Sequence, residues 1–216
     1  MLKRKVLETI YQRLYRAYGP QHWWPADSAF EVMVGAVLTQ NTAWKNVEQA
    51  IDNLRHGDYL DMHRMLSLSS RKLARHIRPS GYFNIKAQRL KNLYLWLEAE
   101  GGIKVLEQQD TASLRSALLS VNGVGPETAD DILLYAFERP VFVIDVYTRR
   151  LFSRLGLVAG TESYETLSGQ FETALPAAVP LYNEYHALIV RHARERCEVT
   201  RQCRHCRVEA PLATSH

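Results

Sequence analysis

The chain has 216 residues, of which 46% are hydrophobic and 23% are charged, with 11 Gly and 8 Pro. This mixture is typical of a globular protein with one domain or two joined lobes, and it excludes collagen-like and low-complexity chains. The net charge of +4 is mild, no apolar run reaches the roughly 20 residues of a membrane helix, and the basic N-terminus lacks the apolar core of a secretory signal, so we expect a soluble, intracellular protein of the cytoplasm.

Helical spacing dominates the N-terminal half. Apolar residues recur three and four positions apart within 7–18, and Gly19-Pro20 ends that helix. Ser28 and Glu31 read as a capping box, in which each side chain satisfies the other's backbone amide, at the start of a helix that reaches Leu38. Further helical segments are expected at 47–54, 59–66, 69–77 and 84–99.

The C-terminal half continues the same pattern. Thr111 is the expected N-cap of a helix that ends before a tight break at Asn122–Pro126. Val141–Ile144 is the one extended apolar run, and it is too short to build a sheet. Helices are expected at 132–137, 145–155, 163–175 and 180–196. The chain is therefore predicted to be all-α, with about ten helices.

The break between the helices at 111–121 and 126–137 reads Gly123-Val124-Gly125-Pro126. Glycines allow positive φ and let another molecule approach the backbone, and Pro126 suits a first helical position. Backbone amides in such a hairpin can hold a phosphate without reading sequence. A plain corner between two helices is the alternative, but one glycine usually suffices there, so DNA binding is favoured.

Asp145 follows the extended apolar run and begins the next helix. A simple N-cap is one interpretation of this position. The other is catalytic, because a carboxylate near a DNA-binding hairpin could activate water or stabilise a cationic sugar.

Hairpin and aspartate together resemble the helix-hairpin-helix (HhH-GPD) DNA glycosylases of the endonuclease III superfamily. Residues 35–42 (GAVLTQNT), residues 78–87 (RPSGYFNIKA) and the C-terminal cysteines carry the resemblance over nearly the whole chain. Within the superfamily, Trp23-Trp24-Pro25 with residues 38–42 looks most like the 3-methyladenine DNA glycosylase III branch.

The resemblance implies two helical lobes with a base-binding cleft between them. Residues 22–134 would form a six-helix barrel that includes the helix-hairpin-helix at about 111–137. Residues 1–21 with 135–216 would form the second lobe, which ends in the cysteine cluster at 197–206.

The resemblance also implies base excision repair, in which a damaged base is flipped out of the duplex before its N-glycosidic bond is broken. The matched catalytic residue is Asp145. Gln40 would enter the gap left by the base, Tyr82 would act as a wedge, and Lys86 would touch phosphate. A surface helix residue and a buried aromatic are the structural alternatives for Gln40 and Tyr82. The remaining implied DNA contacts are Asn122, Gly123, Val124, Gly125 and Thr128.

One departure from the bifunctional members concerns position 127. They carry a lysine there that attacks the sugar, whereas this chain has Glu127. A carboxylate cannot form a Schiff base, so a monofunctional glycosylase that uses water is predicted. An endonuclease III-like glycosylase and lyase acting on oxidised pyrimidines or mismatches is the runner-up, and a non-catalytic DNA-binding module is the third possibility.

Tryptophan suggests the substrate. Trp23, Trp24 and Trp44 match aromatic positions of the base pocket in the 3-methyladenine branch, and Glu127 is expected to face the same pocket. Alkylated purines are cationic, and indole faces attract cations. Each tryptophan taken alone could equally be core filler. The expected partner is double-stranded DNA containing a damaged base, bound by a monomer associated with the nucleoid.

The only three cysteines are Cys197, Cys203 and Cys206, a number that cannot form a disulfide framework. Relatives hold a [4Fe–4S] cluster with four cysteines, and the fourth is missing here. His205 or His216 could complete the set, and a Cys3His zinc site is an alternative to a labile or vestigial cluster. No cofactor is expected to be required for the chemistry. The remaining histidines show no ligand spacing and are read as structural.

The same C-terminal region is rich in arginine, with Arg194, Arg196, Arg201, Arg204 and Arg207. Such a cluster fits a polyanion and a solvated helix face about equally well.

Overall fold

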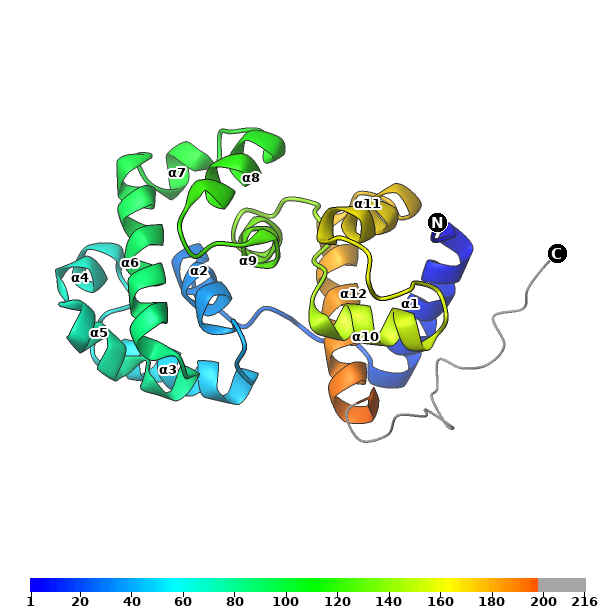
Figure 1. Ribbon diagram of the computed structural model, residues 1–216, viewed down its shortest axis with the longest axis horizontal. Helices are drawn as coiled ribbons and strands as arrows, with labels where there is room; N and C mark the ends of the chain where they lie inside the picture. The colour runs from blue at the N-terminus through cyan, green and yellow to red at the C-terminus, as the bar shows by residue number, and fades with distance from the viewer. Residues whose placement is uncertain (198–216) are drawn as a thin grey trace. The chain divides into compact units, whose positions relative to one another are not determined.

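The computed structural model describes residues 1–197, and every regular element within them is a helix. This confirms the all-α prediction for that part of the chain. The described residues divide into two compact units, one of Met1–Pro25 with residues 140–197, the other of Ala26–Arg139 (Figure 1). The predicted division placed the corresponding boundaries at 22 and 134.

The second unit, Ala26–Arg139, is built around two helices of different character. α2 (Ala29–Leu38) is buried from Phe30 to Leu38, so it forms the centre of the core. α6 (Phe83–Ala99) is the long helix, with α4 (Met62–Ser67) and α5 (Ser70–His76) along one side of it and α2 along the other (Figure 1). The other elements of this unit are α3 (Trp44–His56), α4 (Met62–Ser67), α5 (Ser70–His76), η1 (Arg78–Ser80), α7 (Ile103–Leu106), α8 (Thr111–Ser120), α9 (Pro126–Asp131) and η2 (Ile132–Ala136).

Side-chain caps begin several of these helices. Ser28 accepts a hydrogen bond from the Glu31 amide, which confirms one half of the predicted capping box. The other half does not form, because the Glu31 carboxylate instead lies 2.6 Å from Arg55 of α3. The cap of α8 is Asp110, whose carboxylate accepts from the amides of residues 112 and 113, so the prediction of Thr111 as the N-cap is wrong by one position.

The first unit packs around α12 (Val179–His192). α12 contacts α1 (Arg4–Tyr18), and the Tyr185 hydroxyl of α12 donates to the Leu7 carbonyl of α1 at 2.9 Å. Phe142 stacks on Phe171 with 4.2 Å between ring centroids. The remaining elements of this unit are α10 (Val146–Arg154), α11 (Tyr164–Ala174) and η3 (Ala193–Cys197).

The extended run Val141–Ile144 is buried, as its composition predicted, yet it pairs with no strand. Side chains of α11 take the place of a neighbouring strand. The Phe142 amide donates to Glu172 at 2.8 Å, and the Phe142 carbonyl accepts from the Ser168 hydroxyl at 2.9 Å. The Ile144 amide donates to the Tyr164 hydroxyl at 3.3 Å. A buried, anchored segment therefore leads directly into Asp145.

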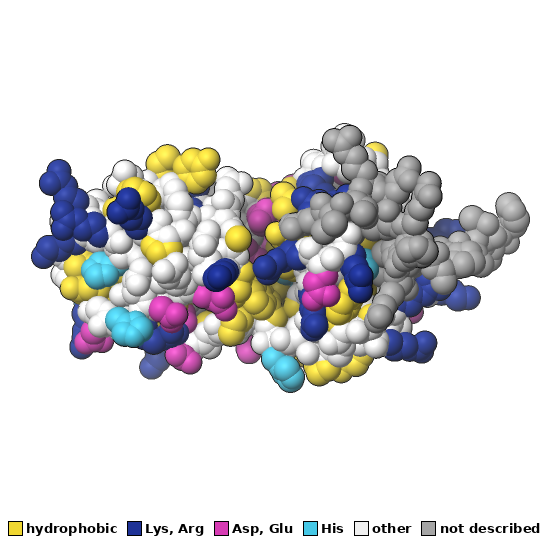
Figure 2. Space-filling model, turned by 90° about the horizontal axis from the view of Figure 1, so that it is seen from below, with side chains coloured by type: hydrophobic (Ala, Val, Ile, Leu, Met, Phe, Trp, Pro, Cys, Tyr) yellow, Lys and Arg dark blue, Asp and Glu magenta, His cyan; other side chains and the backbone are white. Residues whose placement is uncertain are grey.

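Charged side chains are unevenly spread over the second unit. Figure 2 shows Lys and Arg side chains gathered at the end that α4 and α5 form. Between residues 1 and 197, no helix is long and apolar enough to span a bilayer.

Candidate functional site

The predicted hairpin is present between α8 and α9. Gly123 has a φ of +101°, and a Cβ atom there would lie 2.3 Å from Cγ of Arg89, so both the backbone conformation and the neighbouring side chain require glycine. Gly125 is exposed, has an extended backbone, and has no atom within 4 Å of the position that a Cβ would take. The first glycine therefore shapes the turn, whereas the second keeps its outer surface open.

A buried ion pair fixes the angle of this hairpin. Arg115 of α8 grips the Asp130 carboxylate of α9 with two contacts, Nε at 2.6 Å and Nη2 at 3.1 Å. The Asp130 side chain is 2% exposed. A bidentate pair of this kind restrains direction as well as distance.

Gln40 lies just after α2 and contacts the hairpin. Its amide nitrogen donates to the Gly123 carbonyl at 3.1 Å and to the Thr128 hydroxyl at 2.9 Å, while its oxygen accepts from Arg89 at 2.5 Å. Thr128 is buried, and in this structure its hydroxyl holds Gln40. Gln40 is therefore more than a surface helix residue.

Tyr82 has the exposure that a wedge needs. Its side chain is 69% exposed, which excludes the alternative of a buried aromatic. Tyr82 and the preceding Gly81 have φ values of +45° and +66°. Positive φ is rare for a bulky residue and carries strain, a combination that is frequent at functional sites.

Lys86 was expected to touch phosphate, but its ammonium faces inward. The residue is 1% exposed, and Nζ donates to the Leu38 carbonyl at 2.9 Å, to the Thr42 hydroxyl at 2.7 Å and to the Ser80 carbonyl at 2.7 Å. Burial, together with the positive charge of Arg89, lowers the pKa of Lys86 to about 8. Because all three ammonium N–H groups are used inside the protein, none is left for a phosphate in this conformation.

Asp145 is the N-cap of α10, as the sequence predicted. Its Oδ1 accepts from the Thr148 amide at 2.7 Å, and the residue is 8% exposed. Its Oδ2 lies 3.5 Å from Nε2 of His186, an ion-pair distance that is long for a hydrogen bond. Burial alone would raise the pKa of the Asp145 carboxyl, but His186 and the Thr148 amide outweigh it, so the pKa lies below its ordinary value.

His186 is the functional candidate that sequence reasoning missed. It belongs to α12, is 6% exposed, and is separated by 41 positions from the aspartate that it contacts. The reading of this histidine as structural relied on ligand spacing along the sequence. No such signal marks a contact between two helices that meet only in the folded unit.

The remaining predicted site residues divide between the units. Trp23 and Trp24 belong to the first unit, with ring centroids 5.3 Å apart, whereas Trp44 and Glu127 belong to the second. Glu127 is exposed in the first turn of α9, and the Asn122 carbonyl accepts from Asn92 of α6 at 3.0 Å. Val124 is buried, so any DNA contact that it makes would use its backbone.

The metal prediction falls mostly outside the described residues. Cys203 and Cys206 lie beyond residue 197, as do Arg201, Arg204 and Arg207, while Cys197 ends η3. In residues 1–197, no group of three or more His, Cys, Asp or Glu side chains is arranged to hold a metal ion. The donor set of the whole chain, three thiols with nearby histidines, suits a Cys3His zinc site in its chemistry and is one thiol short of an ordinary [4Fe–4S] set.

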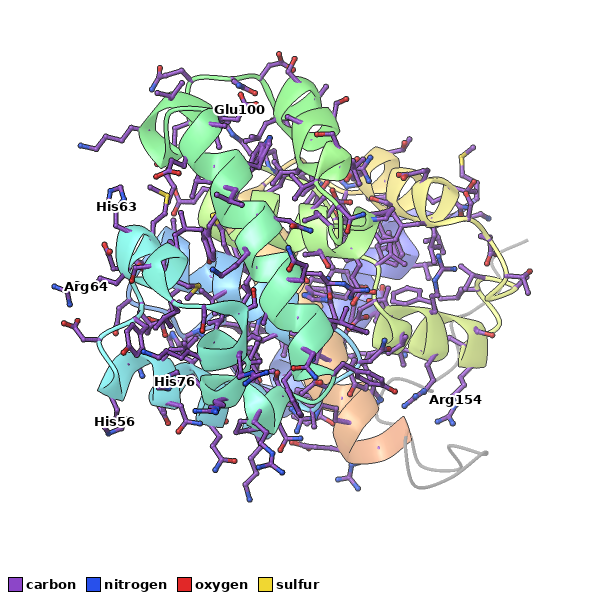
Figure 3. The ribbon with its side chains drawn as sticks, turned by 60° about the vertical axis from the view of Figure 1, so that its left-hand side comes forward. His56, His63, Arg64, His76, Glu100 and Arg154 are labelled. Carbon is purple, nitrogen blue, oxygen red and sulfur yellow. The ribbon has the colours of Figure 1, made fainter. Side chains whose placement is uncertain are left out.

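A hollow of about 630 Å³ in the second unit contains none of the predicted site residues. It lies between α3 and α5, where Figure 3 shows His56 and His76. Its lining residues are Asn53, His56, Gly57, Tyr59, Lys72, Arg75 and His76. The predicted site of this unit lies instead around the start of α6 and the hairpin.

Comparison with known proteins identifies the family. The sequence profile of the HhH-GPD superfamily of base excision DNA repair proteins matches residues 34–177, which include the hairpin and Asp145. The chain belongs to this superfamily. The HhH-GPD chain is also 46% identical over 210 residues to a candidate DNA repair glycosylase of Methanocaldococcus jannaschii, with 96% of each chain covered.

Two further comparisons involve better-defined proteins. An endonuclease III of Sulfolobus acidocaldarius is 29% identical over 173 residues, which cover 79% of this chain and 75% of that one. The crystal structure of the Helicobacter pylori 3-methyladenine DNA glycosylase bound to 1,N6-ethenoadenine superposes with a TM-score of 0.74 at 28% identity, covering 90% of this chain and 98% of that one. A DNA complex of endonuclease III, at 19% identity and a TM-score of 0.78, shares the fold over 94% of this HhH-GPD chain and 91% of that one.

The family and the geometry agree on the coarse function. The HhH-GPD chain is a DNA glycosylase of base excision repair, and DNA is its partner. DNA glycosylases either only hydrolyse the N-glycosidic bond or, with an amine nucleophile, also cleave the strand. Which of these applies here, and on which base, depends on the individual residues.

Proposed function

We propose that this glycosylase acts as a monomer that removes an alkylated purine, such as 3-methyladenine, from double-stranded DNA by hydrolysis, leaving an abasic site in an intact strand. The observation that carries the proposal is Asp145. A buried carboxylate, kept ionised by His186 and the Thr148 amide, is the group that such a reaction needs.

Hydrolysis of the N-glycosidic bond needs water as its only co-reactant. The bond between C1′ of the sugar and the base nitrogen breaks, and its electron pair neutralises the positive charge of the alkylated base. A water oxygen forms the new bond to C1′, and its proton passes to Asp145 and then to solvent. The carboxylate also stabilises the positive charge that develops on the sugar in the transition state.

The lack of a lysine at position 127 supports hydrolysis over strand cleavage. Position 127 carries a glutamate, which is exposed in the first turn of α9. The buried Lys86 is engaged by three oxygens and is poorly placed to attack a sugar. Borohydride trapping tests this point, because a Schiff base between enzyme and DNA would be reduced to a stable covalent adduct. An adduct with the wild-type chain would contradict the hydrolytic mechanism.

The hairpin is proposed to bind the DNA backbone. Gly125 is exposed and has no atom within 4 Å of the position that a Cβ would take, so phosphate oxygens can approach the backbone amides there, while Gly123 shapes the turn. Asn122, Val124 and Thr128 would serve through the backbone or by holding Gln40. Such contacts position the duplex and are independent of its sequence.

Gln40 and Tyr82 are proposed to act on the distorted duplex. Tyr82 is exposed and held by a strained turn, which suits a side chain that separates stacked bases. The Gln40 side-chain amide can form the hydrogen bonds that the flipped base no longer makes. To do so, the amide either leaves the Gly123 carbonyl and the Thr128 hydroxyl or shares its N–H donors between them and the DNA.

The substrate class rests on the aromatic residues and one relative. The cationic ring of an alkylated purine would be attracted to indole faces, and Trp23, Trp24 and Trp44 are the candidates, with Glu127 adding a negative charge. The Helicobacter pylori glycosylase, at 28% identity, is a 3-methyladenine enzyme that binds an adenine derivative. The endonuclease III relatives favour the runner-up, a glycosylase and lyase acting on oxidised pyrimidines or mismatches.

A panel of damaged duplexes tests the substrate. We expect release of 3-methyladenine or 7-methylguanine from duplexes that contain them. Release of thymine glycol alone, or of the thymine in a G·T mismatch alone, would overturn the alkylated-purine proposal in favour of the runner-up. Release of no base, with DNA still bound, would point to the non-catalytic module.

A further inference from the structure

The first three turns of α6 carry polar side chains that each contact a different loop of the second unit. Lys86, Arg89 and Asn92 are spaced three residues apart, which places them along one face of the helix. Lys86 contacts the segment after α2 and the end of η1, Arg89 contacts Gln40, and Asn92 contacts the hairpin carbonyl at Asn122. The helix therefore touches the segment that carries Gln40, the end of η1 before Tyr82, and the hairpin.

Lys86 is the most deeply buried of the three, and its burial is costly. Burying an ammonium group costs a large free energy unless hydrogen bonds or an opposite charge compensate for the lost hydration. None of the three acceptors of the Lys86 ammonium is a carboxylate. An apolar side chain of similar length would fill the same space without this cost. What the lysine adds is therefore the three hydrogen bonds themselves.

These hydrogen bonds join the bases of two loops. The Leu38 carbonyl and the Thr42 hydroxyl lie on either side of Gln40, and the Ser80 carbonyl immediately precedes Gly81-Tyr82. The Thr42 hydroxyl also donates to the Ser80 carbonyl, so both loops share one polar centre. A change in the position of either loop would leave a buried donor or acceptor without its partner.

We propose that Lys86 is a positioning residue that couples the Gln40 loop to the Tyr82 loop, so that both side chains enter the damaged duplex in a fixed relation. This inference rests on the proposed function of these two residues. Coupling lowers the entropy that would be lost in ordering two separate loops at the moment of binding. Lys86 thus acts on lesion recognition without touching DNA.

The test compares two lysines of the same helix. Lys86→Met keeps an unbranched side chain one heavy atom shorter than lysine and removes its donors. Lys91→Met is the matched control, because the Lys91 ammonium also binds backbone carbonyls, those of Leu66 and Leu68, on a part of the unit that carries no predicted DNA contact. Thermal unfolding of both variants first establishes that each is folded.

Binding is then measured to two duplexes, one with a tetrahydrofuran abasic-site analogue and one undamaged. For Lys86→Met we expect affinity for the abasic analogue to fall about 10- to 100-fold, within the range of coupling between residues of one hydrogen-bond network, with affinity for undamaged duplex within about twofold of wild type. For Lys91→Met we expect neither to change. Equal losses on both duplexes, or equal effects of the two variants, would overturn the proposal.

A double-mutant cycle separates coupling from general destabilisation. In a Gln40→Ala, Tyr82→Ala background, Lys86→Met should cause little further loss of lesion preference, because the two side chains that it positions are already gone. A full additional loss would mean that Lys86 acts in another way. If Lys86→Met does not fold, Thr42→Val removes one partner of the same centre and should give a smaller change in the same direction; no change would overturn the coupling.

The readout is independent of excision. Binding to the abasic analogue requires no base release, so a wild-type chain that excises nothing from the damaged panel would contradict the proposed function and leave the Lys86 test standing. Wild-type lesion preference that persists in Lys86→Met would contradict only the inference about Lys86.

Discussion

The neighbourhood of Asp145 in the first unit and the hairpin region of the second are built on opposite principles. Asp145 sits in a packed interior, where its two carboxylate oxygens have assigned neighbours and its pKa is set by burial and charge. The hairpin and Tyr82 depend on open backbone and exposed surface, at conformations that few residues tolerate. A reaction whose transition state carries charge benefits from a fixed, poorly hydrated group that stabilises this charge. DNA binding instead requires exposed groups that the DNA backbone can contact.

The largest expected effect is that of Asp145→Asn, which tests whether catalysis depends on Asp145 and DNA binding does not. The amide keeps the size of the side chain and loses the negative charge, so excision should fall by about 10²- to 10⁴-fold while DNA affinity stays near that of wild type. Single-turnover base release and fluorescence anisotropy measure the two quantities separately. Normal excision by this variant would reduce Asp145 to a helix cap.

The glycines of the hairpin provide the second test. Gly123→Ala should weaken binding to every duplex sequence and lower the stability of the fold by about 1–3 kcal/mol, because its φ is +101° and Arg89 occupies the space of a Cβ. Gly125→Ala is the control for the fold, since its Cβ would meet nothing within 4 Å. Replacement of Gly125 by leucine should then lower DNA affinity at unchanged stability and salt slope. Equal stability of the Gly123 and Gly125 alanine variants would contradict this division of roles.

His186→Gln sharpens the electrostatic side of the comparison. His186 lowers the pKa of Asp145, so its loss should raise that pKa, move the acid limb of the excision rate to higher pH and slow excision at mildly acidic pH more than at neutral pH. His192→Gln is a matched control, because His192 is a buried histidine of the same helix whose ring contacts Tyr18 instead of Asp145. If the acid limb of the pH profile is unchanged in His186→Gln, the proposed effect of His186 on the Asp145 carboxylate is wrong.

The last prediction concerns the pH dependence of stability and Lys86. The pKa of Lys86 is about 8 in the folded chain and near 10.5 when unfolded, so between these values the unfolded state binds more protons and the fold gains stability as pH rises. The stability difference between wild type and Lys86→Met should therefore move in favour of wild type by about 1–3 kcal/mol from pH 8 to pH 10. Chemical denaturation at several pH values measures it, and a difference that stays constant would contradict the shifted pKa.

Local patterns predicted much of this architecture. The helical periodicity, the hairpin glycines and the N-cap position of Asp145 are properties of neighbouring residues, and each can be read within a few positions of the chain. The predicted cap Thr111 is wrong by one position because Asp and Thr both cap helices, and the folded helix shows that Asp110 accepts the amides. The short helix α7 escaped notice because its four residues are too few to show a period.

Contacts between distant segments could not be predicted in the same way. Glu31 pairs with Arg55 instead of completing its capping box, and His186 reaches Asp145 from a helix much later in the chain. The family resemblance implied a phosphate contact for Lys86, but the residue is buried and its ammonium faces inward. Its burial depends on carbonyl groups brought together by α2, η1 and α6, which the spacing of residues in α6 alone does not reveal.

Because α11 anchors the segment Val141–Ile144, the position of the candidate catalytic residue depends on side chains of α11. Glu172, Ser168 and Tyr164 hold the backbone just upstream of Asp145 through bonds that an adjacent strand would otherwise supply. A single substitution can remove a side-chain partner, whereas the backbone partners that a neighbouring strand supplies are kept in almost any substitution. Activity could therefore be tuned from α11, a helix that contains none of the predicted site residues, by small shifts in where the carboxylate comes to rest.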